Sequence, residues 1–231
     1  MAATNSKSSQ TSGSLAKQLV AEFLGTATLL YAVVGSGIFA QSLSEDVGIQ
    51  VIINATSIGL ALAALIWIFV PISGAHFNPV VTLAAVLNRH IPPFRAFGYI
   101  IASTLGAIVG TIFANVSFGL TAIQLSTNER ATVGTFSAEV FATAALVLII
   151  QLLGARRQSN LAPLVIGGWI TSAIYFTSST SFANPAVTIA RMLTDTLTGI
   201  NPISALMFVG AQLIGLPIGI VLGRWFSKGS N

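Results

Sequence analysis

The sequence has very little charge: ten Lys and Arg and six Asp and Glu make up 7% of its 231 residues. Soluble domains carry about 25% charged residues, so a chain this poor in charge cannot cover a water-facing surface. The shortage predicts an integral membrane protein, and a mean hydropathy of +0.85 agrees with it. The formal net charge of +4 comes from scattered residues rather than from a basic patch, so we expect no nucleic-acid partner.

Cysteine is absent and there are two histidines. The absence of cysteine excludes disulfides, thiolate nucleophiles and metal sites built on thiolates. The histidines are isolated and the carboxylates do not cluster, so the sequence contains neither a nucleophile–base pair nor a set of metal ligands. We therefore predict no enzymatic activity, no metal site and no cofactor.

Long apolar runs fill most of the remaining sequence. A bilayer core of roughly 30 Å needs about 20 apolar residues per helix. Six runs are long enough, near residues 18–40, 48–70, 96–119, 136–154, 161–179 and 202–223. Two more, near 79–88 and 185–194, are too short to span and begin at Asn-Pro pairs. We predict a membrane domain over 15–225, a disordered cytoplasmic tail over 1–14 and a second tail over 226–231.

Basic residues are divided unequally between the two sides of the predicted bundle. With six spans, the side that carries both termini holds Lys7, Lys17, Arg89, Arg95, Arg156, Arg157, Arg224 and Lys228. The other side holds Arg130 and Arg191, beside Glu45, Asp46, Glu129 and Asp195. Because cytoplasmic loops carry the excess of Lys and Arg, we predict that both termini are cytoplasmic and that the protein lies in a cell (inner or plasma) membrane.

The two halves of the chain repeat each other, over about 15–120 and about 135–225. The run "AEFLGTATLL" in the first span matches "AEVFATAALV" in the fourth, which pairs Glu22 with Glu139. The run "GAIVG" in the third span matches "GLPIG" in the sixth, and this glycine spacing is typical of close helix packing. Three spans per half is an odd number, so the halves enter the membrane from opposite sides, as in the inverted repeats of transport proteins.

Two Asn-Pro pairs open the short apolar runs, as "NPVVT" from Asn78 and "NPAVT" from Asn184. Asn is a favoured N-cap and Pro is favoured at the first helical position, so each pair predicts a helix start. Half-helices that enter from opposite faces meet near the midplane, and each N-terminus carries roughly half a positive charge. We expect this arrangement to repel cations and protons while the Asn amides offer donors to a neutral solute.

These motifs resemble the aquaporin (major intrinsic protein) family, through "SGAHFNPVVT", "NPAVT" and "AEFLGT". The resemblance implies an all-α membrane protein with six transmembrane helices and two half-helices in an inverted 3+3 repeat. It also implies a pore in each protomer of a homotetramer and passive conduction of water or small uncharged solutes across the lipid bilayer. The pore midplane would be formed by Asn78, Pro79, Val80, Asn184, Pro185 and Ala186.

The buried ionisable residues allow two interpretations each. Glu22 and Glu139 are either proton-relay carboxylates or acceptors for the irregular backbone of the half-helices, and their symmetry favours the second role. His76 is either a pH gate near the cytoplasmic mouth or a packing and hydrogen-bonding residue. Arg191 lies four residues before Asp195, a spacing at which the two side chains pair.

The sequence departs from the family at the outer constriction. Val187 stands where most members have Arg, directly after the second Asn-Pro-Ala. The remaining constriction positions fall on Ile58, Ser181 and either Ile174 or Ser172, of which we prefer Ile174. Arg191 lies one turn beyond Val187 and is placed at the mouth, although it is also a candidate replacement for the missing Arg. In the first motif Val80 replaces Ala and adds bulk where the half-helices touch.

The second motif and its flank resemble a divergent bacterial-type branch associated with arsenic resistance. That resemblance implies permeation by neutral metalloid acids or methylated arsenicals, with glycerol-like solutes and water as further candidates. Two alternatives remain open from the sequence. One is an ion-coupled secondary transporter of a small solute, since inverted repeats and broken helices occur there too; the other is a strict water channel.

Overall fold

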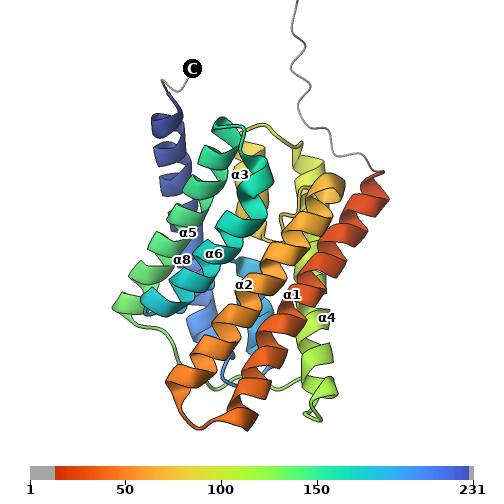
Figure 1. Ribbon diagram of the computed structural model, residues 1–231, viewed down its shortest axis with the longest axis vertical. Helices are drawn as coiled ribbons and strands as arrows, with labels where there is room; N and C mark the ends of the chain where they lie inside the picture. The colour runs from red at the N-terminus through yellow and green to blue at the C-terminus, as the bar shows by residue number, and fades with distance from the viewer. Residues whose placement is uncertain (1–13, 229–231) are drawn as a thin grey trace, which may run out of the picture.

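The apolar runs form a bundle of helices in the computed structural model, which describes residues 14–228 and contains no strand among them (Figure 1). In chain order the helices are α1 (Leu15–Leu43), α2 (Val47–Ser73), α3 (Pro79–Leu87), α4 (Pro93–Ser117), α5 (Val133–Ala155), η1 (Ser159–Leu161), α6 (Ala162–Phe176), α7 (Pro185–Ala190), η2 (Arg191–Leu193) and α8 (Pro202–Ser227). The predicted N-terminal tail therefore lies outside the described residues except for Ser14, and α8 continues two residues into the predicted C-terminal tail.

Five of the described helices are long and apolar enough to cross a membrane: α1, α2, α4, α5 and α8. The predicted span 161–179 is shorter than expected, because α6 has 15 residues and rises only about 22 Å. The turn η1 precedes it, and the chain leaves the helix at Thr177 to form the loop that leads to α7. This loop takes residues that hydropathy alone assigns to the helix.

The helix starts follow from local side chains. Asp46 accepts a hydrogen bond from the N–H of Ile49 at the start of α2, and Asn201 accepts one from Ser204 at the start of α8. At α5, Thr132 forms a capping box with Thr135. These side chains satisfy backbone donors that have no partner inside the helix.

Glycines bring the long helices of each half into close contact. In the first half α1 packs along α4, and in the second half α5 packs along α8. A Cβ added to Gly110 would lie 2.1 Å from the carbonyl oxygen of Ala27, and one added to Gly219 would lie 2.5 Å from that of Ala144. The predicted glycine seams therefore lie at backbone-to-backbone contacts.

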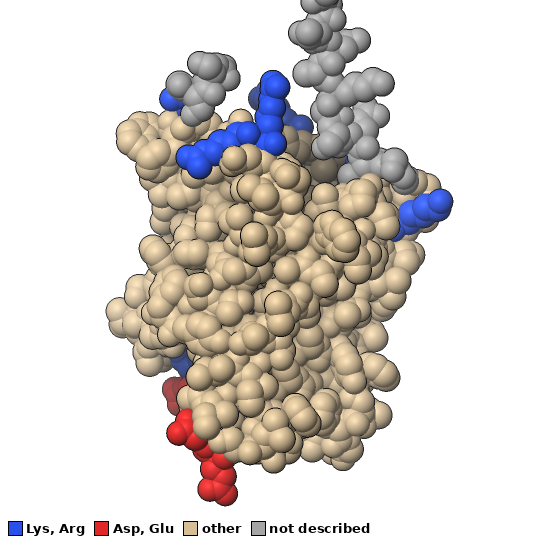
Figure 2. All heavy atoms as spheres, in the orientation of Figure 1, with Lys and Arg blue, Asp and Glu red and all other residues tan. Residues whose placement is uncertain are grey.

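The two halves meet along α2 and α6, which pack against each other. In Figure 1, α3 occupies the upper part of the bundle and α7 the lower part, so the two short helices lie in opposite halves of its height. The start of α1 and the end of α8 lie at the same end of the molecule. Figure 2 shows that the visible Lys and Arg gather mainly at this end, which we call the basic end, and Asp and Glu at the opposite, acidic end.

Candidate functional site

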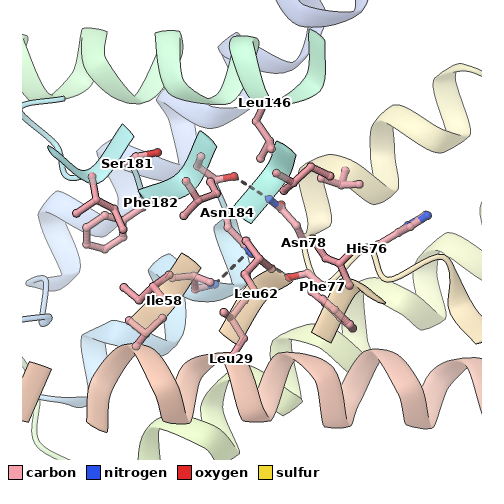
Figure 3. A pocket seen from close by; sticks show the side chains of 18 of the residues that line it. Leu29, Ile58, Leu62, His76, Phe77, Asn78, Leu146, Ser181, Phe182 and Asn184 are labelled. Atoms are coloured by element: carbon pink, nitrogen blue, oxygen red, sulfur yellow. Dashed lines mark hydrogen bonds between the residues drawn. The ribbon is translucent and has the colours of Figure 1, made fainter. Parts of the chain in front are cut away.

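A cavity of about 100 Å³ lies between the two halves, lined by residues of α1, α2, α5, α6, the two loops before the short helices, and the short helices themselves. Its wall is mostly aliphatic, with Leu29, Leu62 and Leu146 around the middle (Figure 3). His76 faces one end of this region, whereas Ser181 and Phe182 face the other.

Asn78 and Asn184 meet in the middle of the cavity and bind the opposite half of the chain (Figure 3). Each side-chain oxygen caps its own helix, with Asn78 accepting from the N–H of Val80 at 2.9 Å and Asn184 from that of Ala186 at 3.0 Å. Each amide nitrogen donates across the molecule, from Asn78 to the carbonyl of Ala183 and from Asn184 to that of Phe77, both at 2.8 Å. A side-chain amide has two N–H donors, so one on each Asn remains for a solute.

The loops that lead into the short helices have the same backbone shape. Ala75 and Phe77 in the first loop, and Ser181 and Ala183 at the matching positions of the second, have positive φ angles between 44° and 51°. This left-handed conformation turns consecutive N–H groups away from helical partners. Each loop therefore needs an acceptor from elsewhere in the fold.

The carboxyl group of Glu22 is the acceptor for the first loop. It accepts hydrogen bonds from the hydroxyl of Ser73 at 2.6 Å and from the backbone N–H groups of His76 and Phe77 at 2.9 and 2.7 Å. Its side chain is fully buried and does not line the cavity. These contacts match support of the loop better than proton relay.

The carboxyl group of Glu139 repeats this arrangement in the second loop. It accepts from the hydroxyl of Ser179 at 2.7 Å and from the N–H groups of Phe182 and Ala183 at 2.8 and 2.9 Å. Gln212 of α8 adds a fourth hydrogen bond, from its amide at 2.7 Å, and also donates to the hydroxyl of Thr188. Sequence comparison of the halves did not single out Gln212.

Three apolar side chains line the cavity toward the acidic end: Ile58 of α2, Ile174 of α6 and Val187 of α7, which we call the apolar ring. Ser181 lines the cavity beside them. Ser172, the alternative to Ile174, is exposed on the outside of α6 and does not line the cavity. The structure thus brings together the four residues that the sequence assigns to the outer constriction.

The remaining residues of the two motifs lie behind the cavity wall. Pro79, Pro185 and Ala186 are buried, and none of them is among the described residues that line the cavity. The buried side chain of Val80 packs with Ala84 and with residues of α5 and α8. Its branched side chain fills space between α3 and these long helices.

Arg191 lies in the cavity wall, one turn beyond Val187. Its Nε donates to the carbonyl of Thr198, and its guanidinium carbon lies 3.5 Å from the centre of the Phe182 ring. It does not pair with Asp195, whose carboxylate accepts instead from the backbone N–H of Thr127 at 2.9 Å. The loop after η2 carries Asp195 away from the helical course on which the i, i+4 spacing relies.

His76 lines the cavity from the first loop. Its Nδ1 lies 3.1 Å from the hydroxyl of Thr82, and its ring packs edge-on against Tyr99 with centroids 5.2 Å apart. These contacts hold the ring in place, as the packing interpretation expects.

Sequence reasoning missed most of the aliphatic cavity wall and three further residues that matter for its chemistry: Asn54, Thr180 and Phe182. Asn54 carried a usable signal, since it is a polar residue within the apolar run of α2 and lies one turn from Ile58. Thr180 and Phe182 belong to the second loop, and their placement depends on its left-handed backbone.

The comparisons with known proteins agree with this geometry. Residues 9–181 match the family model described as major intrinsic protein. The chain belongs to the major intrinsic protein family. It is 41% identical over 211 residues to the aquaglyceroporin AqpS of Rhizobium meliloti (strain 1021), covering 91% of this chain and 90% of that one. It is 36% identical over 163 residues to aquaporin-1 of Homo sapiens, covering 65% of this chain and 60% of that one.

A solved structure shares the fold of this major intrinsic protein. The X-ray structure of the aquaglyceroporin from Plasmodium falciparum superposes with a TM-score of 0.69, at 22% identity, over 94% of this chain and 97% of that one. The chain is therefore a multi-pass integral membrane protein with the aquaporin fold. Family membership makes it a passive channel for water or small neutral solutes, not an enzyme.

Proposed function

We propose that this channel conducts small uncharged solutes larger than water through a widened, apolar outer constriction. The observation that carries the proposal is the apolar ring, in which Val187 takes the position where most family members have Arg. An Arg there would extend a long charged side chain into the lumen. Val leaves a shorter wall beside Ser181, whose buried hydroxyl oxygen has no hydrogen-bond partner among the described residues.

The proposed solutes are glycerol-like molecules, neutral metalloid acids and methylated arsenicals, with water as a smaller companion. The similarity to a protein described as an aquaglyceroporin supports glycerol-sized solutes. The metalloid assignment rests on the resemblance of the second motif and its flank to the arsenic-resistance branch. The metalloid assignment is the more specific part of the proposal.

Asn78 and Asn184 act as the pore midplane, and Glu22 and Glu139 support the loops that position them. The facing N-termini of α3 and α7 exclude cations, because each carries roughly half a positive charge. Pro79 and Pro185 begin these helices, and the residues after them seat the helices in the bundle.

We propose that the protein lies in a cell membrane with both termini in the cytoplasm, as a homotetramer with one pore in each protomer. The concentration of Lys and Arg at the basic end supports this orientation. Large apolar side chains on the outside of α2 and α6, among them Trp67, Leu60 and Leu164, are available to lipid or to neighbouring protomers.

Purified protein in liposomes tests the proposal by stopped-flow light scattering. We expect passive uptake of glycerol and of boric acid, with water flow and without proton or potassium current. Glycerol uptake that requires an imposed proton gradient would establish a coupled transporter instead, and water flow without glycerol uptake would establish a strict water channel.

A further inference from the structure

Two polar side chains line the cavity just outside the apolar ring: Asn54 of α2 and Arg191 of η2. Asn54 precedes Ile58 by four residues and Arg191 follows Val187 by four. Four residues of helix correspond to about 6 Å. Because α2 starts at the acidic end and α7 runs toward it (Figure 1), both polar residues are displaced toward the acidic end.

The guanidinium group of Arg191 is fixed but retains free donors. Its side chain is only 6% exposed, the ring of Phe182 packs 3.5 Å from the guanidinium carbon, and Nε is bound to the carbonyl of Thr198. Within residues 14–228, Nη1 and Nη2 have no hydrogen-bond partner, and neither nitrogen is among the buried polar atoms. Their N–H groups are therefore available on the cavity side.

The amide of Asn54 is also held in place, but it leaves an acceptor rather than donors available. Its nitrogen donates to the carbonyl of Val33 at 2.8 Å and to the hydroxyl of Ser36 at 2.9 Å. The carbonyl of Val33 can only accept, so the nitrogen must point toward it and the amide oxygen away. That oxygen accepts from none of the described residues and remains an acceptor for a solute.

We propose that Asn54 and Arg191 form a polar constriction one turn outside the apolar ring, and that this pair selects neutral solutes with hydroxyl groups. The assignment rests on the proposed channel function. A hydroxyl accepts a hydrogen bond from Arg191 and donates one to Asn54, which offsets the loss of water as the solute enters the apolar ring. The positive charge of Arg191 also repels cations at this level.

Arg130 provides a matched control because it shares surroundings but not the cavity. Its guanidinium carbon lies 5.6 Å from the centre of the same Phe182 ring. Its nitrogens donate to the carbonyls of Gly199 and Leu197, both at 2.7 Å, and it is not among the described residues that line the cavity. Replacing it removes a half-buried Arg near the same aromatic ring without removing a donor from the cavity wall.

The test is the ratio of glycerol to water permeability in proteoliposomes for the wild type, Arg191→Met, Arg191→Lys and Arg130→Met. Met preserves length while removing the donors. We expect Arg191→Met to lower the ratio about tenfold, as for the loss of a hydrogen bond to a charged group. Arg191→Lys should retain cation exclusion and lose about threefold, because it keeps the charge without the planar fork. Arg130→Met should change the ratio less than twofold.

Asn54→Leu gives an independent measurement of the same polar constriction. It tests the proposal on its own if Arg191→Met yields no folded protein by size exclusion in detergent. We expect it to lower the ratio about threefold, as for one neutral hydrogen bond. A folded Arg191→Met or Asn54→Leu with an unchanged ratio overturns the assignment and leaves the channel function intact. An equal loss in Arg130→Met also overturns it. If the wild type conducts neither solute above empty liposomes, the proposed function itself fails.

Discussion

The two halves of the molecule share the parts that hold the short helices but differ in the residues that face solute beyond them. The loops before α3 and α7 have the same left-handed turns, and each has a buried carboxyl group as acceptor, Glu22 for the first loop and Glu139 for the second. The position held by His76 in the first loop is held by Phe182 in the second. His76 packs edge-on against Tyr99 at 5.2 Å, and Phe182 against Phe208 at 5.1 Å, so even the aromatic contact is repeated.

The two ends of the cavity differ because His76 and Phe182, at matching positions of the loops, have different roles. His76 is itself a polar residue of the cavity wall toward the basic end. Phe182 instead provides the surface on which Arg191 rests toward the acidic end. The inverted repeat thus supplies a symmetric scaffold, and single substitutions on it give the two mouths different chemistry.

The largest expected effect comes from breaking the glycine seams. Gly110→Ala places a methyl group against the backbone of α1 and Gly219→Ala against that of α5. Backbone cannot move aside as a side chain can, so we expect each variant to lose about 3 kcal/mol and most of its folded yield. Gly110→Ala should be the more severe, because its contact is shorter.

Gly210→Ala in α8 is the control, since a Cβ there meets nothing within 4 Å. Folded yield is measured by size exclusion in detergent and stability by thermal midpoint. Equal behaviour of all three variants would contradict the assignment of the seams to backbone contact.

The next effect compares the two carboxyl acceptors. Glu22→Ala leaves three donors without their acceptor and Glu139→Ala leaves four. Each buried unpaired donor costs about 1–3 kcal/mol, so we expect Glu139→Ala to be the more destabilising. Glu→Gln at either position should be less destabilising than Ala, because the amide oxygen still accepts the donors on one side, although the donors to the other carboxyl oxygen lose their acceptor.

Folded yield and thermal midpoint rank the four carboxyl variants. Well-folded Ala variants with altered solute flux would point to a direct role of these residues in transport. In a Gln212→Leu background the stability losses caused by Glu22→Ala and Glu139→Ala should become more similar, because the additional donor to Glu139 is gone.

A third prediction concerns the matched residues Val81 and Val187, which both line the cavity. Val187→Arg restores the residue that most family members have and breaks this symmetry. We expect glycerol flux to fall about tenfold and water flux to fall less, because a long charged side chain narrows the ring and favours the smaller solute. Val187→Leu, which adds bulk without charge, separates the two contributions in the same assay.

A correctly folded Val187→Arg with unchanged glycerol flux would show that the apolar ring does not limit solute size. Strong disturbance of folding would instead indicate that Arg191 already occupies the space that the new side chain needs.

Most of the scaffold could be predicted from the sequence, because it depends on residues that are close together in the chain. The Asn-Pro pairs of this chain begin α3, α7 and α8, and the matching of Glu22 with Glu139 could be seen without coordinates. The length of α6 could not, since hydropathy does not show where an apolar chain leaves the helix. The contact of Arg191 with Phe182 depends on a left-handed loop, and the lumen-facing position of Asn54 depends on how α2 is rotated about its axis.

The smallest expected effect concerns one backbone position at which the halves differ. Gly74 in the first loop has a φ of 92°, and Thr180 at the matching position of the second has a φ of 58°. A side chain makes the left-handed region unfavourable by about 1–2 kcal/mol, and a β-branched residue tolerates it poorly. Glycine adopts it freely but loses more conformational freedom on folding.

Thr180→Gly should therefore stabilise the protein by about 0.5–1 kcal/mol, since relief of strain exceeds the added entropy cost. Gly74→Thr should destabilise it by about 1–2 kcal/mol, with the Cβ meeting the His76 ring at 3.4 Å. Thermal midpoints in detergent measure both changes, and glycerol flux shows whether the cavity is preserved when Thr180 is removed from its wall. If Thr180→Gly lowers the midpoint as Gly74→Thr does, backbone strain is not what separates the two loops, and the Thr180 side chain contributes a stabilising contact of its own.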